Sequence, residues 1–176
     1  MNNNIIEEKS NILKDFLGNE FKTNCIGCAI ANHAIEIPGG LIFENEKFTI
    51  QQDPLIPING FIIVNAKAHV NSINNLNKED RSELIELINN VIIFLKELDV
   101  VEKITILQEE QSSHLHFWIF PQLEWMKQDS KRINNIREIC KYAQLNATEK
   151  DKYEILVTVK KLKSKFKVKY HPTDKE

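Results

Sequence analysis

Apolar and polar residues alternate along residues 111–121, in the order Gln-Ser-Ser-His-Leu-His-Phe-Trp-Ile-Phe-Pro. A period of two is typical of a half-buried β-strand, so His114, His116 and Trp118 are predicted to project from one face. Neighbouring side chains on that face lie about 6.5 Å apart. A row of ring nitrogens at this spacing could span a metal ion, a phosphate group, or both.

The apolar spacing elsewhere predicts further strands and helices. Residues 5–17 show helical spacing, and Gly18 could end that helix. A longer helix is expected over 77–98, with an inner apolar stripe between Leu84 and Leu95. Short apolar runs predict strands at 41–43, 48–50, 60–64, 103–107 and 115–120.

Helical spacing replaces the strand pattern in the last third of the chain. Apolar residues between Ile133 and Ala143 mark one helix, and Thr148 with Asp151 is a capping signal that opens another. The second helix ends in a lysine-rich stretch, which indicates a solvated face or, as a second interpretation, a phosphate- or partner-binding patch. We therefore expect an α+β fold: an antiparallel sheet of about five strands with helix 77–98 packed on it, plus a C-terminal helical extension.

The composition limits the classes of function. The chain has 176 residues, 42% of them hydrophobic and 27% charged, which is enough for one domain with a real core. A net charge of −2 gives no strong case for nucleic acid or an anionic membrane as partner. The longest apolar runs are too short to cross a bilayer, and the N-terminus lacks the layout of a signal peptide. Three cysteines without an export signal indicate a reducing compartment, so we expect a cytoplasmic location.

Four residues could form a zinc site. Cys25 and Cys28, which we expect in a turn, have a spacing that commonly binds zinc. His69 follows the strand at 60–64, and His114 begins the histidine strand. Two cysteines and two histidines are a recognised closed set for structural zinc, which would join the N-terminal turn to two strands. Two reduced thiols with unrelated histidines are the alternative, and the residue types alone favour neither.

His116 is the candidate nucleophile. Neutral imidazole is available near neutral pH, and its attack on phosphorus would form a covalent phosphoimidazole that divides a difficult transfer into two steps. Donors for the phosphate oxygens would come from the backbone amides of the preceding loop and from the side chains of Gln111, Ser112, Ser113 and Trp118. A satisfied core histidine is the alternative, and the polar Gln-Ser-Ser sequence disfavours it.

These motifs resemble the histidine-triad superfamily of nucleotide hydrolases and transferases. The family pattern is His-x-His-x-His followed by apolar residues, and a proline five residues after His116 sets the register so that His116 matches the middle, nucleophilic histidine. The segment Cys-Ile-Gly-Cys at 25–28 is similar to the family's N-terminal CxxC. The run from Asp53 to His69 is similar to the segment in which an aspartate precedes a Lys-x-His sequence. The resemblance covers about residues 20–122.

The resemblance implies roles for single residues. His116 would form a covalent nucleotidyl intermediate, Asp53 would hydrogen-bond the ribose, and Gln111 and Ser112 would contact the phosphates. The activity implied is hydrolysis or nucleotidyl transfer at the α-phosphate of a nucleotide or dinucleotide substrate, and the assembly implied is a homodimer. A structural zinc ion would be held by four residues, Cys25, Cys28, His69 and His114.

The sequence departs from the family pattern at the third triad position, which Trp118 occupies. The family's histidine contacts the scissile bridge or the leaving group, whereas indole is only a donor and cannot shuttle a proton at neutral pH. This departure motivates an alternative function: a nucleotide-binding regulatory or interaction module with a zinc-stabilised fold and little turnover. Residues 1–122 are expected to form the histidine-triad-like nucleotide-binding domain, with 123–176 as a helical extension packed on the same domain.

Overall fold

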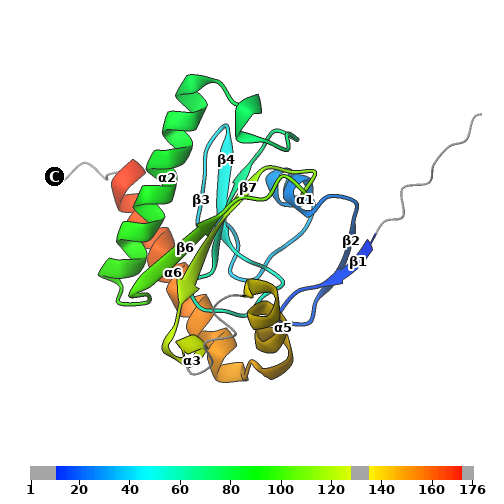
Figure 1. The fold of residues 1–176 in the computed structure, drawn as a ribbon, viewed down its shortest axis with the longest axis vertical. Coiled ribbons are helices and arrows are strands. Elements are labelled where there is room, and N and C mark those ends of the chain that lie inside the picture. The colour runs from blue at the N-terminus through cyan, green and yellow to red at the C-terminus, as the bar shows by residue number, and fades with distance from the viewer. Residues whose placement is uncertain (1–10, 128–134, 172–176) are drawn as a thin grey trace, which may run out of the picture.

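A five-stranded antiparallel sheet forms the centre of the fold (Figure 1). The computed structural model describes residues 11–127 and 135–171. The strands lie in the order β3-β4-β5-β7-β6, and each neighbouring pair is antiparallel. Their bounds are Phe43–Glu44 for β3, Phe48–Gln52 for β4, Ile62–Ala66 for β5, Lys103–Leu107 for β6 and His116–Gln122 for β7. The predicted α+β class with an antiparallel sheet of five strands is confirmed.

The helices begin where the capping signals predicted. The side chain of Asn77 accepts a hydrogen bond from the backbone N–H of Asp80 at the start of α2, and Thr148 forms a capping box with Asp151 at the start of α6. In the described part of the chain, none of the helices is long and apolar enough to span a membrane. The bounds are Ile26–Ala31 for α1, Lys78–Glu97 for α2, Glu124–Lys127 for α3, Ile136–Asn146 for α5 and Glu149–Tyr170 for α6, with a short 3-10 helix at Ile73–Asn75.

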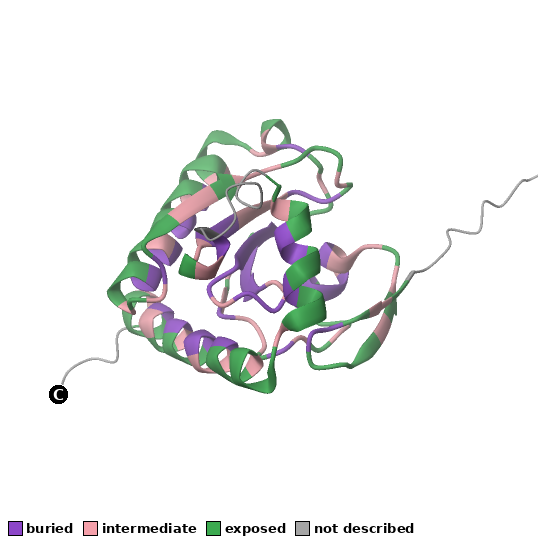
Figure 2. Cartoon of the chain, turned by 60° about the horizontal axis from the view of Figure 1, so that its bottom comes forward, coloured by how far each residue is buried: buried purple, intermediate pink, exposed green. Residues whose placement is uncertain are grey.

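Helices α2 and α6 cover one face of the sheet. Val64 and Ile119 from the sheet pack in one hydrophobic core with Val91 of α2 and Phe166 of α6. Figure 2 shows the same arrangement, with buried residues on the inner sides of these helices and exposed residues on their outer sides. The last helix of the chain therefore shares the core of the sheet. The division of the chain at residue 122 stays a prediction.

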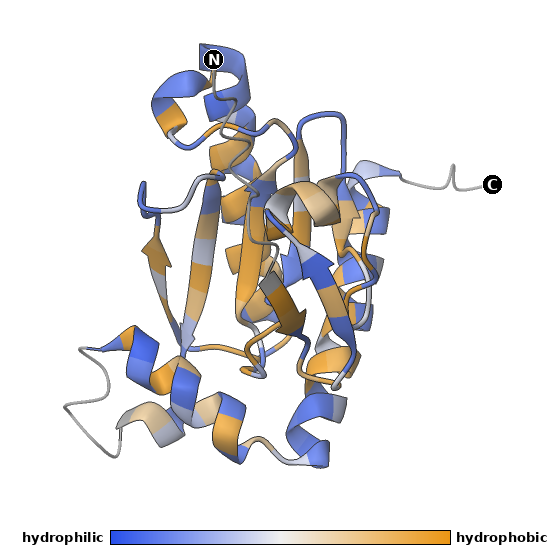
Figure 3. Ribbon diagram, turned by 90° about the vertical axis from the view of Figure 1, so that its right-hand side faces the viewer, coloured by the Kyte–Doolittle hydropathy of each residue, from blue (hydrophilic) through white to orange (hydrophobic). Residues whose placement is uncertain are grey.

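The opposite face of the sheet carries α1 at one end and α5 at the other. Asn65 of β5 donates a side-chain hydrogen bond to the carbonyl oxygen of Gly27 in α1, at 3.2 Å. At the other end, Phe61 and Phe120 pack with Ile139 of α5 in a second core. Hydrophobic residues are concentrated in the central strands, whereas the outer helices alternate between hydrophobic and hydrophilic residues (Figure 3). Side chains of β4, β5 and β7 line a pocket on this face.

The helix predicted for residues 5–17 is wrong in the part that the structure describes. Asn11–Lys14 forms strand β1, which pairs with β2 at Glu20–Thr23 in an antiparallel hairpin. Residues 5–10 lie outside the described residues.

Side-chain hydrogen bonds explain the turn that replaces the end of that helix. The Asp15 carboxylate accepts hydrogen bonds from the backbone N–H groups of Leu17 and Asn19, both at 2.9 Å. Gly18 has a φ of 98°, which a residue with a Cβ rarely adopts. Such local bonds compete with helix formation, and here they favour the hairpin.

The segment predicted as a turn at Cys25 and Cys28 is the start of a helix. Cys25 is the N-cap residue of α1, and its Sγ accepts a hydrogen bond from the backbone N–H of Cys28 at 3.4 Å. The CxxC spacing therefore places both thiols at the first turn of one short helix.

A buried polar contact joins α2 to α6. Asn90 of α2 is fully buried; its Nδ2 donates to Tyr170 Oη and its Oδ1 accepts from Lys169 Nζ, both at 2.7 Å. Lys165 Nζ forms an ion pair with Glu97 Oε2, also at 2.7 Å. Lys165 and Lys169 at the lysine-rich end of α6 therefore have partners within the fold, and a phosphate- or partner-binding patch there stays a prediction.

The Asn90 contact predicts the effect of removing one hydroxyl group. Tyr170→Phe keeps the ring but leaves the buried amide of Asn90 without an acceptor, so the free energy of unfolding should fall by about 1–3 kcal/mol. Urea denaturation measures this free energy of unfolding. Tyr153→Phe, which removes an exposed hydroxyl group from the same helix, is the control. Equal midpoints for the two variants would contradict the prediction.

Candidate functional site

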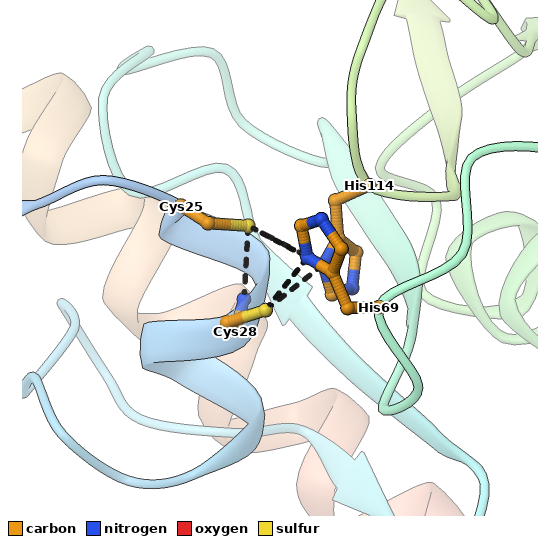
Figure 4. Close-up of side chains that lie close together, drawn as sticks. All are labelled: Cys25, Cys28, His69 and His114. Atoms are coloured by element: carbon orange, nitrogen blue, oxygen red, sulfur yellow. Dashed lines mark hydrogen bonds between the residues drawn. The ribbon is translucent and has the colours of Figure 1, made fainter. Parts of the chain in front are cut away.

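Two cysteines and two histidines meet beside the N-terminus of α1 (Figure 4). The Sγ atoms of Cys25 and Cys28 and the Nδ1 atoms of His69 and His114 all lie within 4.8 Å of one another. His114 Nδ1 is 3.4 Å from each sulfur, and His69 Nδ1 is 3.7 Å from Cys25 Sγ and 3.0 Å from Cys28 Sγ. We call these four residues the thiol–imidazole cluster.

The cluster fits a tetrahedral zinc ion. With bonds of about 2.3 Å to sulfur and about 2.0 Å to nitrogen, tetrahedral geometry requires sulfur–nitrogen separations of about 3.6 Å. The four observed separations, 3.0–3.7 Å, bracket that value. Zinc also binds thiols and imidazoles readily, whereas calcium and magnesium prefer oxygen ligands.

The His114 ring is held by its second nitrogen. Its Nε2 lies 2.6 Å from the carbonyl oxygen of Ala66, which can only accept, so Nε2 carries the proton and Nδ1 offers its lone pair to the cluster. Burial lowers the pKa of His114, which favours the neutral form that binds metals. Gly27 makes room for this ring: a Cβ at that position would lie 2.6 Å from two His114 ring atoms.

The Cys28 thiol is poorly placed to ionise on its own. Burial, together with the neighbouring Cys25, raises the pKa of Cys28 to about 11. A thiolate at neutral pH would therefore need a cation beside it, and metal binding would release its proton.

His116 is fixed in one tautomer by the backbone. Its Nδ1 lies 2.8 Å from the carbonyl oxygen of His114, so Nδ1–H donates and Nε2 keeps a free lone pair. Ser112 supports the same carbonyl: its Oγ donates to the oxygen of His114 at 3.0 Å and accepts from the N–H of His114 at 3.3 Å. The predicted phosphate ligand Ser112 therefore has a hydroxyl group that stabilises the turn before β7.

A pocket of about 320 Å³ opens beside His116. Its apolar wall comes from Ile26 and Ile30 of α1, Leu55 of the loop after β4, and Ile63 of β5. A larger cavity of about 460 Å³ lies next to α3, α5 and α6, but the described residues that line it include no histidine or cysteine. The polar lining of the pocket at His116 includes Gln51, Asp53, Asn65, Ser112, Ser113, His114 and Trp118.

Asp53 lies at the far end of this pocket in a tight loop. Its Oδ1 accepts hydrogen bonds from the backbone N–H groups of Leu55 at 2.8 Å and Ile56 at 3.0 Å. The residue is half-buried, and burial raises the pKa of its carboxyl group to about 6, against the effect of these two bonds. Asp53 is therefore ionised at neutral pH and retains Oδ2 as a further acceptor.

The structure places most of the predicted site residues together. Ser113 and Trp118 line the pocket, and the ring centroid of Trp118 is 6.2 Å from that of His116 on the same face of β7, as the alternation predicted. Gln111 is exposed and does not line the pocket. Its predicted contact with phosphate has no support in this geometry.

Three residues of the site had no signal in the sequence. Gly27 is needed because the His114 ring lies against it, and Gln51 and Asn65 each fall one residue beyond a predicted strand, at 48–50 and 60–64. Gln51 is almost fully buried, and its Oε1 has no hydrogen-bond partner among the described residues. The positions of Gln51 and Asn65 in the pocket lining become apparent only in the folded sheet, where β4 and β5 lie beside β7.

The comparisons with known proteins agree with this architecture. No family model and no curated protein matches the sequence. A hypothetical histidine triad nucleotide-binding protein from Sulfolobus tokodaii matches with a TM-score of 0.59 and 17% identity, over 86% of this chain and all (100%) of that one.

Two further solved structures show the same likeness. A Hit-like protein involved in cell-cycle regulation from Bartonella henselae, with an unknown ligand, matches with a TM-score of 0.57 and 16% identity, over 82% of this chain and 98% of that one. A Zn-bound histidine triad family protein from Mycobacterium smegmatis matches with a TM-score of 0.53 and 17% identity, over 80% of this chain and 96% of that one. The chain therefore has the histidine-triad fold that its sequence motifs resemble.

Proposed function

We propose that this protein is a nucleotide hydrolase or nucleotidyltransferase that acts at the α-phosphate through a covalent intermediate on His116. The single observation that carries the proposal is the hydrogen bond from His116 Nδ1–H to the carbonyl oxygen of His114, at 2.8 Å. It leaves Nε2 as the nucleophilic atom of an imidazole that borders a pocket. A pocket of about 320 Å³ is in the size range for a small organic ligand.

The pocket residues suit the parts of a nucleotide. The apolar wall of Ile26, Ile30, Leu55 and Ile63 would receive the base, and the free oxygen of Asp53 would accept hydrogen bonds from ribose hydroxyl groups. The α-phosphate would then lie against His116, with the hydroxyl group of Ser113 and nearby backbone N–H groups as donors to its oxygens.

The reaction would have two displacements. His116 Nε2 attacks phosphorus, the bond from phosphorus to the leaving group breaks, and the leaving group takes the bonding electrons. The backbone carbonyl of His114 then stabilises the positive charge on the substituted imidazole. Water or a second substrate next attacks phosphorus and loses its proton to solvent, and the N–P bond returns its electrons to Nε2.

The thiol–imidazole cluster is proposed to hold a structural zinc ion. The zinc-bound neighbour from Mycobacterium smegmatis and the donor set of this cluster both support the assignment. When bound, zinc would lock His114 in place, and because two thiolates balance its two positive charges, its role would be structural. The homodimer and the cytoplasmic location stay predictions from the sequence.

A second candidate function is nucleotide binding with little turnover. Trp118 supports it, because an indole beside the nucleophile offers no proton to a leaving group. Micromolar binding of nucleotides by calorimetry, together with no turnover across a nucleotide panel, would select this function over the enzymatic one.

The zinc proposal predicts the metal content of single variants. Purified wild-type protein should carry about one zinc per chain, and Cys28→Ser should lose it because oxygen is a poor substitute for thiolate in a closed site. Inductively coupled plasma mass spectrometry measures the zinc content per chain. Cys140→Ala, which removes a buried thiol outside the cluster, should keep the zinc. Equal zinc in the two variants would refute the site.

The nucleophile is tested by covalent trapping. After incubation with a panel of nucleoside 5′-phosphate anhydrides and acid-free quenching, intact-mass spectrometry should detect one nucleotidyl group on wild-type protein. His116→Ala should lose the adduct, and turnover should fall by about 10³-fold or more, because no other side chain can replace the attacking nitrogen. His33→Ala, at an exposed histidine, is the control, and an adduct that persists in His116→Ala would overturn the assignment.

Asp53 predicts a pH dependence of stability. Its pKa of about 6 in the folded state lies above its unfolded value of about 3.9, so folding favours the protonated form. Its contribution to the free energy of unfolding is therefore full below about pH 4 and is lost as the pH rises through about 6.

Urea denaturation between about pH 4.5 and about pH 7.5 tests this linkage. The stability of wild-type protein relative to Asp53→Asn should decrease as the pH rises, because the amide cannot ionise. Glu46→Gln, at an exposed turn residue, should give a constant difference. A constant difference for Asp53→Asn as well would show that its carboxyl group is not desolvated.

A further inference from the structure

Among the residues that the structure describes, the pocket contains a candidate nucleophile but no side chain placed to protonate a leaving group. In an in-line displacement, phosphorus approaches Nε2 to about 3 Å and the leaving atom lies beyond it, about 5 Å from Nε2. Among the described residues that line the pocket, four have a side chain that titrates, Cys25, Asp53, His114 and His116. His116 is the attacking group. The Cys25 sulfur and His114 Nδ1 face each other within the thiol–imidazole cluster, and His114 Nε2 donates to the carbonyl oxygen of Ala66, so neither side chain is directed at the leaving atom.

Asp53 is too far from the leaving atom to act as its acid. Its backbone N–H donates to the carbonyl oxygen of Phe61 at 2.9 Å, which places it opposite Phe61 on β5, and the β5–β7 register places Phe61 opposite Phe120. Two strand spacings and four residues along β7 therefore separate Asp53 from His116, about 16 Å between backbones. That position suits the distal end of a bound nucleotide.

Glu109 is the nearest other carboxylate by strand register, because it would oppose His116 if β6 continued beyond Leu107. Its Oε2 accepts a hydrogen bond from Arg137 Nη2 at 2.7 Å, in an exposed ion pair. A carboxylate in such a pair is an acceptor and not a proton donor. Ser112 and Ser113 carry only hydroxyl groups, which do not act as acids at neutral pH.

Trp118 occupies the position next to the nucleophile. Its ring lies 6.2 Å from the His116 ring, and it packs edge to face against Phe61 with centroids 5.4 Å apart and planes at 78°. This packing holds the indole in one orientation. The indole N–H can donate a hydrogen bond to a leaving oxygen, but it does not transfer its proton.

From this arrangement, and resting on the proposed function, we infer that Trp118 restricts the enzyme to nucleotidyl substrates whose leaving group departs as a stable anion. Phosphate and polyphosphate groups of nucleoside phosphoanhydrides belong to that class, and amines and alkoxides do not. In the first displacement, the leaving oxygen takes both electrons of its bond to phosphorus and receives no proton. The imidazolyl nucleotide is then hydrolysed, and the proton from water goes to solvent.

A series of leaving groups on one nucleotide tests the inference. The probes are aryl esters of the nucleoside 5′-monophosphate that the trapping panel ranks highest, with phenols of increasing pKa, and the matching 5′-phosphoramidate. Single-turnover formation of the adduct on His116 should slow steeply as the pKa of the phenol rises, and the phosphoramidate should react slowest. Wild-type rates that do not depend on the leaving group would overturn the inference.

Two variants separate proton donation from packing. Trp118→His restores an acid at this position and should raise the ratio of phosphoramidate rate to nitrophenyl ester rate by about 10²-fold or more. Trp118→Phe keeps an aromatic ring without an acid and should leave that ratio close to the wild-type value. Equal ratios in the two variants would overturn the role of Trp118, and the wild-type series decides the matter if Trp118→His does not fold. The absence of any adduct, even with the nitrophenyl ester, would instead refute the covalent function and the inference with it.

Discussion

The position of His114 is the constraint on which the site depends. Its Nε2 donates to the carbonyl of Ala66, its Nδ1 faces two sulfur atoms, and its own carbonyl accepts the Nδ1–H of His116. One residue therefore joins the thiol–imidazole cluster to the candidate nucleophile. A shift of this residue would alter the cluster and the tautomer of His116 together, because both are set within one short segment.

The two faces of the sheet differ in the side chains that they bury. One face packs apolar side chains of the strands against α2 and α6, and residues such as Val64 and Ile119 are completely buried there. The other face carries polar residues that a pure core would exclude, among them Gln51 and Asn65. Buried polar groups reduce stability unless they find partners. The hydrophobic core that the opposite face forms with α2 and α6 offsets this cost.

Much of this arrangement could be predicted from the sequence where the signal is local and physical. The period of two at 111–121 places His116 and Trp118 on one face, since alternation follows from the geometry of any strand. The helix predicted for 5–17 is wrong over the described residues 11–17, because Asp15 accepts hydrogen bonds from backbone N–H groups that support a hairpin. The spacing of apolar residues carries no information about such side-chain hydrogen bonds, which compete with helix formation.

Other features depend on contacts between segments that are distant in sequence. The need for glycine at position 27 arises from the His114 ring, 87 residues away, and no pattern around the CxxC motif indicates it. Gln111 is close to the histidines in sequence, which suggested a phosphate contact, whereas the structure places it exposed and outside the pocket lining, so this contact stays a prediction. Residue type identifies candidates well where the chemistry is scarce, as for thiols and imidazoles. It identifies them poorly for amides and glycines, whose roles are set by their neighbours.

The effect of Trp118 on the proposed chemistry depends on the other side chains of the pocket as well as on the missing histidine. A substitution at one position of a catalytic row changes the chemistry only if no other group can take over the lost task. In the described pocket the titratable groups are the candidate nucleophile His116, two members of the thiol–imidazole cluster, and Asp53, about two strands away. Under the proposed function, the pocket would keep charge stabilisation and lose proton donation, and these two effects act on different substrates. Selectivity among leaving groups would then follow from the groups that the described pocket lacks as much as from those that it contains.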